Sequence, residues 1–161
     1  METRHNILAW LLAGERSHAD PARCFDALSP VLAGRAPAGA PYTVYEQLNH
    51  VRYWQGIYLR RLDGEAVPTP PTAAQGWPGP ARPEGDAAWD AAVEDFRAGL
   101  RRALAIAHAA GLEEGLPNWD GMNRAHGLAL LAAHNAYHAG QVVLLRRQLD
   151  AWPPPGVGDT W

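Results

Sequence analysis

The sequence predicts an all-α protein, a four-helix bundle with a long crossover connection. Four stretches of about 20 or more residues carry apolar side chains at helical spacing, and none shows the period-two pattern of a strand. Segments rich in proline and glycine separate these stretches, and the longest, residues 64–85, is the expected crossover. With 161 residues, we expect a single domain over 1–161, with residues 150–161 as a non-helical tail packed on it.

The first helical tract is expected over Glu2–Leu28, in two pieces. Its beginning is apolar and favours a helix, whereas Asp20 and Pro21 match an N-cap followed by proline at the first helical position. We therefore expect a kink or a restart at Asp20. A loop is expected over residues 29–41, because this segment is rich in proline and glycine.

The second helix is expected to begin at Thr43 and to end at Leu62. Thr43 and Glu46 have the spacing of a capping box, in which each side chain satisfies a backbone N–H group of the other residue. Arg60 and Arg61 lie near the expected C-terminus, where positive charge is favourable. Asp63 and Gly64 then stop the helix.

The third and fourth helices are expected over residues 86–110 and 123–149. Apolar side chains recur at helical spacing in both, and Gly111 ends the third helix. The fourth helix carries an apolar stripe made of Leu128, Leu131, Val142, Leu145 and Leu149. Together the four helices supply the apolar faces that a bundle needs.

Composition and charge exclude several classes of protein. The net charge is −3 and no basic run occurs, so the sequence gives no electrostatic reason to expect binding to nucleic acid. Cys24 is the only cysteine, which excludes an internal disulfide and favours a reducing compartment. No secretory signal pattern or membrane-spanning run is evident. The expectation is a cytoplasmic protein that binds neither membranes nor nucleic acid.

Polar side chains interrupt the apolar stripe of the fourth helix in the stretch HNAYHAGQ, residues 134–141. At about 100° per residue, His138 lies about 40° from His134, and both lie in the middle of the stripe. The two rings are roughly 6 Å apart along the helix axis, so both can reach one divalent ion. Buried histidines can instead form hydrogen bonds with tyrosine or asparagine, and this alternative stays open.

His50 is the best candidate for a third ligand, since it lies midway along the second helix beside the buried stripe. Three histidine ligands leave coordination positions open, as in catalytic metal sites. Asn135 and Gln141 are expected to orient a histidine or to hold a bound water molecule. A site made of histidine and water suits Zn, Ni, Fe or Mn about equally.

Three segments resemble the DinB-like superfamily, which includes YfiT-type proteins: LLAAHNAYHAGQVVLLRRQL, YEQLNHVRYWQ and the closing AWPPPGVGDTW. The resemblance covers nearly the whole chain. It implies a four-helix bundle with a long crossover, a homodimer, and a divalent metal ion held by His50, His134 and His138.

The resemblance also implies a class of reaction, because some members transfer or isomerise substrates with bacillithiol, mycothiol or glutathione. The expected function is a metal-dependent S-transferase that joins a low-molecular-weight thiol to an electrophilic small molecule. The alternatives are a metal-binding stress-response protein without turnover and a metal-assisted hydrolase. The sequence indicates no catalytic residue beyond the metal ligands.

Overall fold

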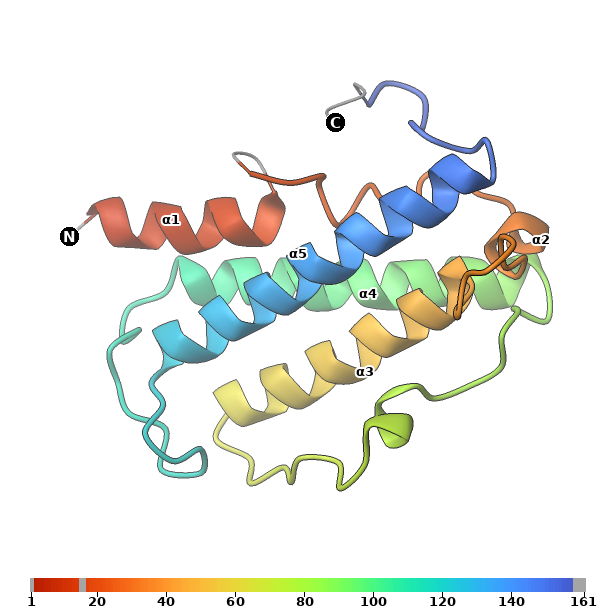
Figure 1. Ribbon diagram of the computed structural model, residues 1–161. Helices are drawn as coiled ribbons and strands as arrows, with labels where there is room; N and C mark the ends of the chain where they lie inside the picture. Colours follow the sequence, from red (N-terminus) through yellow and green to blue (C-terminus); the bar gives the residue numbers. More distant parts are fainter. Residues whose placement is uncertain (1, 15–16, 158–161) are drawn as a thin grey trace.

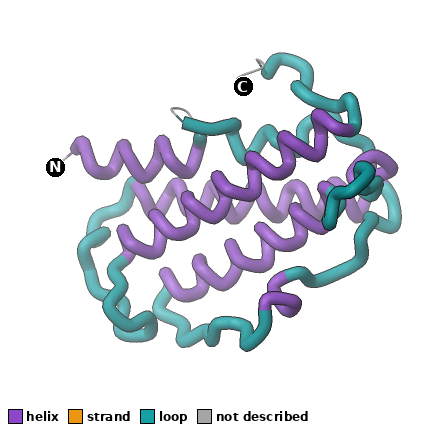
Figure 2. Tube along the Cα trace, viewed as in Figure 1, coloured by secondary structure: helices purple, strands orange, loops and turns teal. Residues whose placement is uncertain are grey.

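The computed structural model describes residues 2–14 and 17–157 of the chain. The bundle consists of four long helices, which are α1 (Glu2–Ala13), α3 (Val44–Leu62), α4 (Asp86–Ala107) and α5 (Arg124–Gln148) (Figure 1). Two short helices lie in the connections, namely α2 (Pro30–Ala33) and the 3₁₀-helix η1 (Ala73–Gly76) (Figure 2). No strand occurs among the described residues, so the predicted fold class is confirmed.

The order of the helices requires a crossover. α3 packs against both α4 and α5, and α1 packs against the same two helices. In cross-section, α4 and α5 therefore occupy opposite corners of the bundle, as do α1 and α3. Figure 1 shows α3 and α4 running in one direction and α1 and α5 in the opposite direction. Because α3 and α4 are parallel, residues 63–85 return along the length of the bundle, which confirms the predicted crossover.

Two groups of buried apolar side chains form the core, one in each half of the bundle. One group joins residues 24–33 to the first turns of α3 and α4 and to the end of α5, and includes Phe25, Leu48, Trp89, Phe96 and Val142. The other fills the opposite half and includes Leu12, Leu62, Leu100, Leu128 and Leu131. Between them, α3 and α5 face each other in opposite directions.

The predicted ends of α3, α4 and α5 agree with the structure to within three residues. The Thr43–Glu46 capping box is confirmed, since Thr43 Oγ1 accepts from the Glu46 N–H at 3.1 Å and Glu46 Oε2 accepts from the Thr43 N–H at 2.8 Å. Asn123 caps α5 by accepting from the backbone N–H of His126 at 2.8 Å.

The prediction for the first tract was wrong for Gly14 and residues 17–28, whereas residues 15 and 16 lie outside the described part. Helix α1 ends at Ala13, and Gly14 turns the chain at a φ of 76°, where an added Cβ would lie 2.8 Å from the carbonyl oxygen of Ala19. Residues 21–27 form turns rather than a second helical piece. The expected loop over 29–41 instead contains the single turn of α2.

Arginine side chains from other helices explain why no helix forms after Asp20. Asp20 does cap a first turn, because its side chain accepts from the Ala22 N–H at 2.8 Å. The carbonyl oxygen of Ala22 then accepts from Arg97 of α4 at 3.0 Å, and that of Cys24 accepts from Arg146 of α5 at 2.6 Å. Both carbonyl groups are therefore engaged by other elements and not by the N–H four residues on, as a helix requires.

The chain after α5 is non-helical through residue 157. The Arg146 guanidinium lies 5.5 Å from the ring centre of Trp152, and Arg23 donates to the carbonyl oxygens of Pro155 and Gly156. Residues 158–161 of the predicted tail lie outside the described part. None of the described helices has the length and hydropathy needed to cross a membrane.

Candidate metal centre

The facing surfaces of α3 and α5 bring three histidine rings together. His50 comes from the middle of α3, and His134 and His138 come from successive turns of α5. One ring nitrogen from each histidine lies within 4.8 Å of the others, and the Nε2 atoms of His50 and His134 are 3.3 Å apart. His50 and His138 are buried and His134 is partly buried. These three histidines could hold a metal ion.

Hydrogen bonds fix the orientation of two of the rings. The Nδ1 atom of His50 lies 2.6 Å from the carbonyl oxygen of Gly76, and that of His138 lies 2.8 Å from Oε1 of Gln47. An oxygen of this kind only accepts, so each Nδ1 atom carries the proton and each Nε2 atom is left as an acceptor, which in His50 faces Nε2 of His134 at 3.3 Å. Oriented lone pairs of this kind are what a metal site requires.

His134 has no such partner. Its Nδ1 atom is buried without a hydrogen bond, while its Nε2 atom faces the lone pair on Nε2 of His50. A histidine that served only to form hydrogen bonds in the core would be expected to satisfy this buried atom. Among the described residues, the rings of His50 and His138 have Gly76 and Gln47 as partners and not tyrosine or asparagine, whereas Asn135, beside His134, raises the pKa of that ring against the effect of burial.

Burial keeps the three imidazoles neutral. It lowers the pKa of His134 to about 4 and that of His138 to about 3, and the neighbouring histidines add to both shifts. Burial also lowers the pKa of His50, against the opposite effect of its hydrogen bond to Gly76. At neutral pH all three rings are therefore deprotonated, which is the form that binds metals.

The crossover connection covers His50. Gly76 supplies the carbonyl oxygen at the end of η1, and the indole of Trp77 stacks on the His50 ring at a centroid distance of 4.0 Å. Tyr42 stacks in turn on Trp77 at 3.7 Å. A side chain at position 76 would place its Cβ 2.8 Å from the indole nitrogen of Trp54, so this close approach requires glycine.

Gln141 and Asn135, which were expected to orient a histidine or to hold a water molecule, differ in how they relate to the three rings. Gln141 reaches His138 indirectly, because its Oε1 atom accepts at 2.7 Å from Nε2 of Gln47, whose own Oε1 contacts His138. Asn135 is buried beside His134, and its side chain raises the pKa of that ring against the effect of burial. Sequence reasoning missed Gln47, Gly76 and Trp77. The one available signal was for Gln47, which precedes His50 by three residues and therefore shares its helix face.

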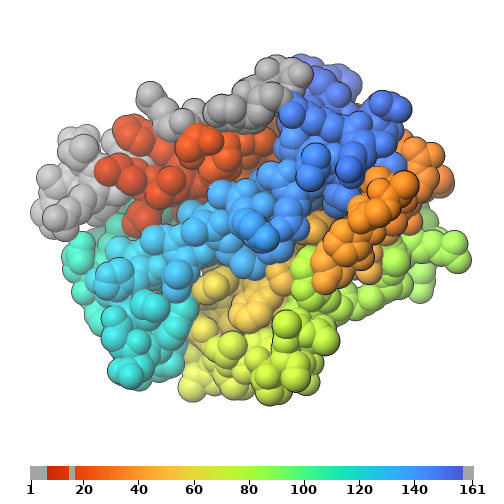
Figure 3. Space-filling view, viewed as in Figure 1, coloured from red at the N-terminus to blue at the C-terminus, as the bar shows by residue number. Residues whose placement is uncertain are grey.

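A cavity of about 510 Å³, the α5 cavity, adjoins His138, one of the three histidines. Residues 38–42, Trp77 and the second half of α5 enclose it, and both Gln47 and His138 belong to its wall. Figure 3 shows the 38–42 segment, in orange, beside the C-terminal half of α5, in blue. The volume is within the range of small-molecule sites.

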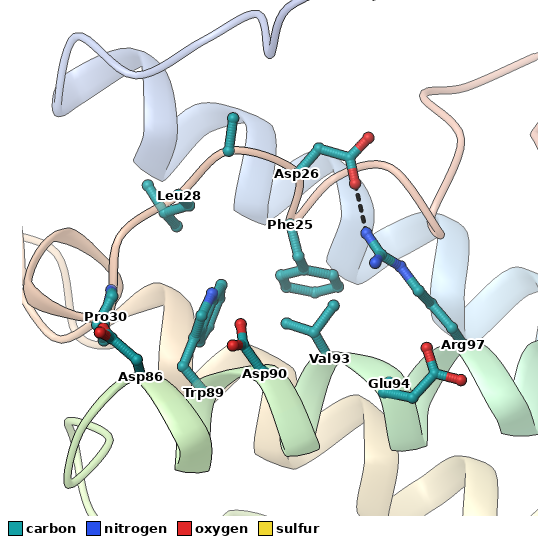
Figure 4. Close-up of a pocket in the computed structure, with 11 residues that line it drawn as sticks. Phe25, Asp26, Leu28, Pro30, Asp86, Trp89, Asp90, Val93, Glu94 and Arg97 are labelled. Carbon is teal, nitrogen blue, oxygen red and sulfur yellow. Dashed lines mark hydrogen bonds and ion pairs between the residues drawn. The ribbon is translucent and has the colours of Figure 1, made fainter.

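A second cavity, of about 600 Å³, lies along α4 and shares no lining residue with the metal centre (Figure 4). Phe25, Trp89 and Val93 point into it, and an ion pair between Asp26 and Arg97 closes one end. Further carboxylates on α4 belong to its rim, from Asp86, Asp90 and Glu94. Despite its size, this acidic cavity contains no histidine and contributes nothing to the metal centre.

The Cys24 thiol is not suited to act as a nucleophile. The thiol is fully buried, and burial raises its pKa to about 12, with a further contribution from the Asp20 carboxylate. The thiolate is therefore not populated near neutral pH.

A four-helix bundle with parallel α3 and α4, and three histidines on the facing surfaces of α3 and α5, defines a class of helical proteins suited to binding metals. A family model of the DinB superfamily matches residues 13–142. The chain therefore belongs to the DinB superfamily. Searches of curated proteins and of solved structures gave no match.

Proposed function

We propose that this protein is a metal-dependent enzyme in which His50, His134 and His138 hold a divalent ion. The reaction is the transfer of a low-molecular-weight thiol to an electrophilic small molecule. The observation that supports this proposal is the arrangement of the histidines: one ring nitrogen from each lies within 4.8 Å of the others, hydrogen bonds at Nδ1 hold two of the rings, and a cavity adjoins His138.

The ligand set fits the chemistry. A divalent ion, when bound, lowers the pKa of a coordinated thiol, so that thiolate is present near neutral pH. Three protein ligands leave coordination positions for such a thiol. In the reaction, the thiol sulfur forms a bond to the electrophilic carbon, the leaving group departs with its bonding electrons, and the thiol proton passes to solvent.

The residues of the chain have three tasks in this scheme. Gly76 and Gln47 hold the rings of His50 and His138 in one orientation. The Trp77 indole covers His50 on the side of the connection. The α5 cavity places the electrophile beside His138 and keeps it partly out of water. Pre-oriented ligands and a neighbouring binding cavity both favour reaction over simple storage of the metal.

The first experiment measures metal content in the purified full chain by elemental analysis. Wild type should carry about one divalent ion per chain, whereas His50→Ala, His134→Ala and His138→Ala should each lose most of it. His126→Ala is the matched control, since His126 lies on α5 but is exposed and outside the cluster. Equal metal content in all five proteins would refute the assignment of the ligands.

The second experiment tests turnover on the metal-loaded protein. Conjugation of 1-chloro-2,4-dinitrobenzene is followed with bacillithiol, mycothiol or glutathione, before and after removal of the metal. The proposal expects metal-dependent conjugation with at least one thiol. Stoichiometric metal with no reaction for any thiol would favour a metal-binding protein without turnover, and hydrolysis of ester probes would favour a metal-assisted hydrolase.

A further inference from the structure

The walls of the α5 cavity combine aromatic rings with aliphatic side chains. The stacked pair of Tyr42 and Trp77 forms one side, and Tyr137 and Leu144 of α5 form the other. Tyr137 is 68% exposed and Leu144 is 58% exposed, and both belong to the wall of this one cavity. Exposed apolar side chains that gather at a hollow mark a place where a ligand or a partner binds.

The polar groups of the cavity are amides. Gln47, Gln141 and Gln148 belong to its wall. Gln47 uses both ends of its amide, toward His138 and toward Gln141. Gln141 accepts through Oε1, and no hydrogen bond among the described residues uses its amide nitrogen. Its N–H groups therefore remain to donate to an oxygen of a bound molecule.

No formally charged side chain belongs to the wall of the α5 cavity within the described part of the chain. A charged group entering it would lose water and find no ion pair in return, which is strongly unfavourable. The acidic cavity along α4 is the contrasting case, because carboxylates surround its aromatic floor (Figure 4). The side chains of the α5 cavity, in contrast, add no charge of either sign, so that the only charge beside it is the ion of the proposed function.

We propose that the α5 cavity binds an uncharged, flat aromatic molecule beside the three histidines, and that the electrophile of the reaction belongs to this class. This inference rests on the proposed function, because it names the substrate class of that same site. The aromatic ring packs between Tyr137 and the Tyr42–Trp77 pair, and an acceptor oxygen of the molecule faces the Gln141 amide.

The test compares two probes with the same ring, titrated by calorimetry into the full chain after its metal has been removed with a chelator, because a divalent ion beside His138 would itself attract an anion. One is naphthalene-2-sulfonate, an anion that coordinates metals poorly. The other is its neutral N,N-dimethyl sulfonamide, which cannot lose a proton to bind the metal. Cationic probes are avoided because the α4 cavity would bind them. We expect the neutral probe to bind at least about tenfold more tightly than the sulfonate.

Three variants locate the binding. Leu144→Trp fills the mouth of the cavity and should weaken the neutral probe about tenfold. Gln148→Arg adds a positive charge to the wall and should bring the two affinities to within about threefold. Ala129→Arg adds the same charge to an exposed position of α5 outside the cavity and should leave the tenfold ratio unchanged.

Equal affinities for both probes in wild type, or no effect of Leu144→Trp, would overturn the inference. Metal content is measured on the same preparations before the chelator is added, which separates the two proposals. Stoichiometric metal without binding of the neutral probe refutes the substrate class and leaves the metal site intact. Selective binding of the neutral probe by preparations that hold no metal as purified and take up none on reloading supports the cavity assignment and refutes the proposed enzyme.

Discussion

The amide of Gln47 illustrates how one side chain sets the properties of the centre. It accepts from His138 and donates to Gln141, so it fixes both the tautomer of His138 and the position of an amide in the α5 cavity. Without it, the His138 ring could turn or carry its proton on the nitrogen that faces the other histidines. Groups behind metal ligands commonly control affinity in this way.

Gln47→Leu should therefore lower metal affinity by about 10- to 100-fold, measured by competition with a chromophoric chelator. Gln55→Leu is the matched control, because Gln55 is also a buried glutamine of α3 but donates to the Phe96 carbonyl on α4, away from the centre. Both variants should lose about 1–3 kcal/mol of unfolding free energy through broken buried hydrogen bonds. Equal metal affinity in the two variants would show that Gln47 supports the fold but does not affect metal binding.

The lowered pKa values of the histidines make the stability of the metal-free chain depend on pH. In the unfolded chain these rings take up protons near pH 6.5, whereas in the folded chain His134 and His138 do so only near pH 4 and pH 3. Above pH 6.5 neither state is protonated, so the rings have no effect. As the pH falls below 6.5, the unfolded chain gains protons first, and the free energy of unfolding decreases until the folded-state pKa values are reached.

The Tm of metal-free wild type should accordingly fall between about pH 7 and 5 more steeply than that of a His134→Gln/His138→Gln double variant, since glutamine does not titrate. Differential scanning calorimetry after treatment with a chelator gives both curves. Carboxylates contribute equally to the two proteins, so the difference between the curves isolates the histidines. Parallel curves would contradict the lowered pKa values.

At the level of whole elements, local sequence signals predicted three of the four long helices closely. The Thr43–Glu46 box and the apolar periodicity of α3, α4 and α5 act within a few residues of each other, so they can be read directly. The segment after Asp20 could not be predicted, because Arg97 and Arg146, far away in sequence, capture the carbonyl oxygens that a helix would use. Tertiary contacts there outweigh a good capping signal.

The same contrast between local signals and tertiary contacts applies to the candidate metal centre. The histidines were identifiable because spacing on one helix predicts a shared face, and family resemblance pointed to His50 as the third. The carbonyl oxygen of Gly76 was not identifiable, since every residue has one and only the path of the crossover brings this one to His50. The stack of Trp77 on His50 depends on that path as well.

Gly76→Ala tests the part played by the crossover. The new Cβ would collide with the indole of Trp54, so η1 should move and its carbonyl oxygen should leave His50. We expect metal affinity to fall about tenfold. Gly85→Ala is the control in the same connection, where an added Cβ meets nothing within 4 Å. An unchanged affinity in Gly76→Ala would mean that the connection does not help to hold His50.

For the whole molecule, the centre ties together the two halves of the sequence. His50 and His134 are 84 positions apart, and α3 and α5 meet across the bundle between the two groups of the core. A ligand that binds only the folded chain stabilises it by about 2.7 kcal/mol at a concentration 100 times its Kd. For a domain of this size, that corresponds to a rise in Tm of about 5–10 °C.

Saturating Zn²⁺ or Ni²⁺ should therefore raise the Tm of wild type by about this amount, as measured by scanning calorimetry. His134→Ala should show a much smaller rise, because it retains only two ligands, whereas His126→Ala should behave like wild type. A similar rise in His134→Ala would place the stabilising ion elsewhere on the protein.

The separation of the histidines along the chain also has a consequence for biosynthesis. A ribosome that adds about 5–20 residues per second needs several seconds to travel from codon 50 to codon 134. During that interval the nascent polypeptide offers an incoming cation a single imidazole of the three. Under the proposed function, loading of the ion therefore follows translation, and its identity is set by the metals available to the finished protein.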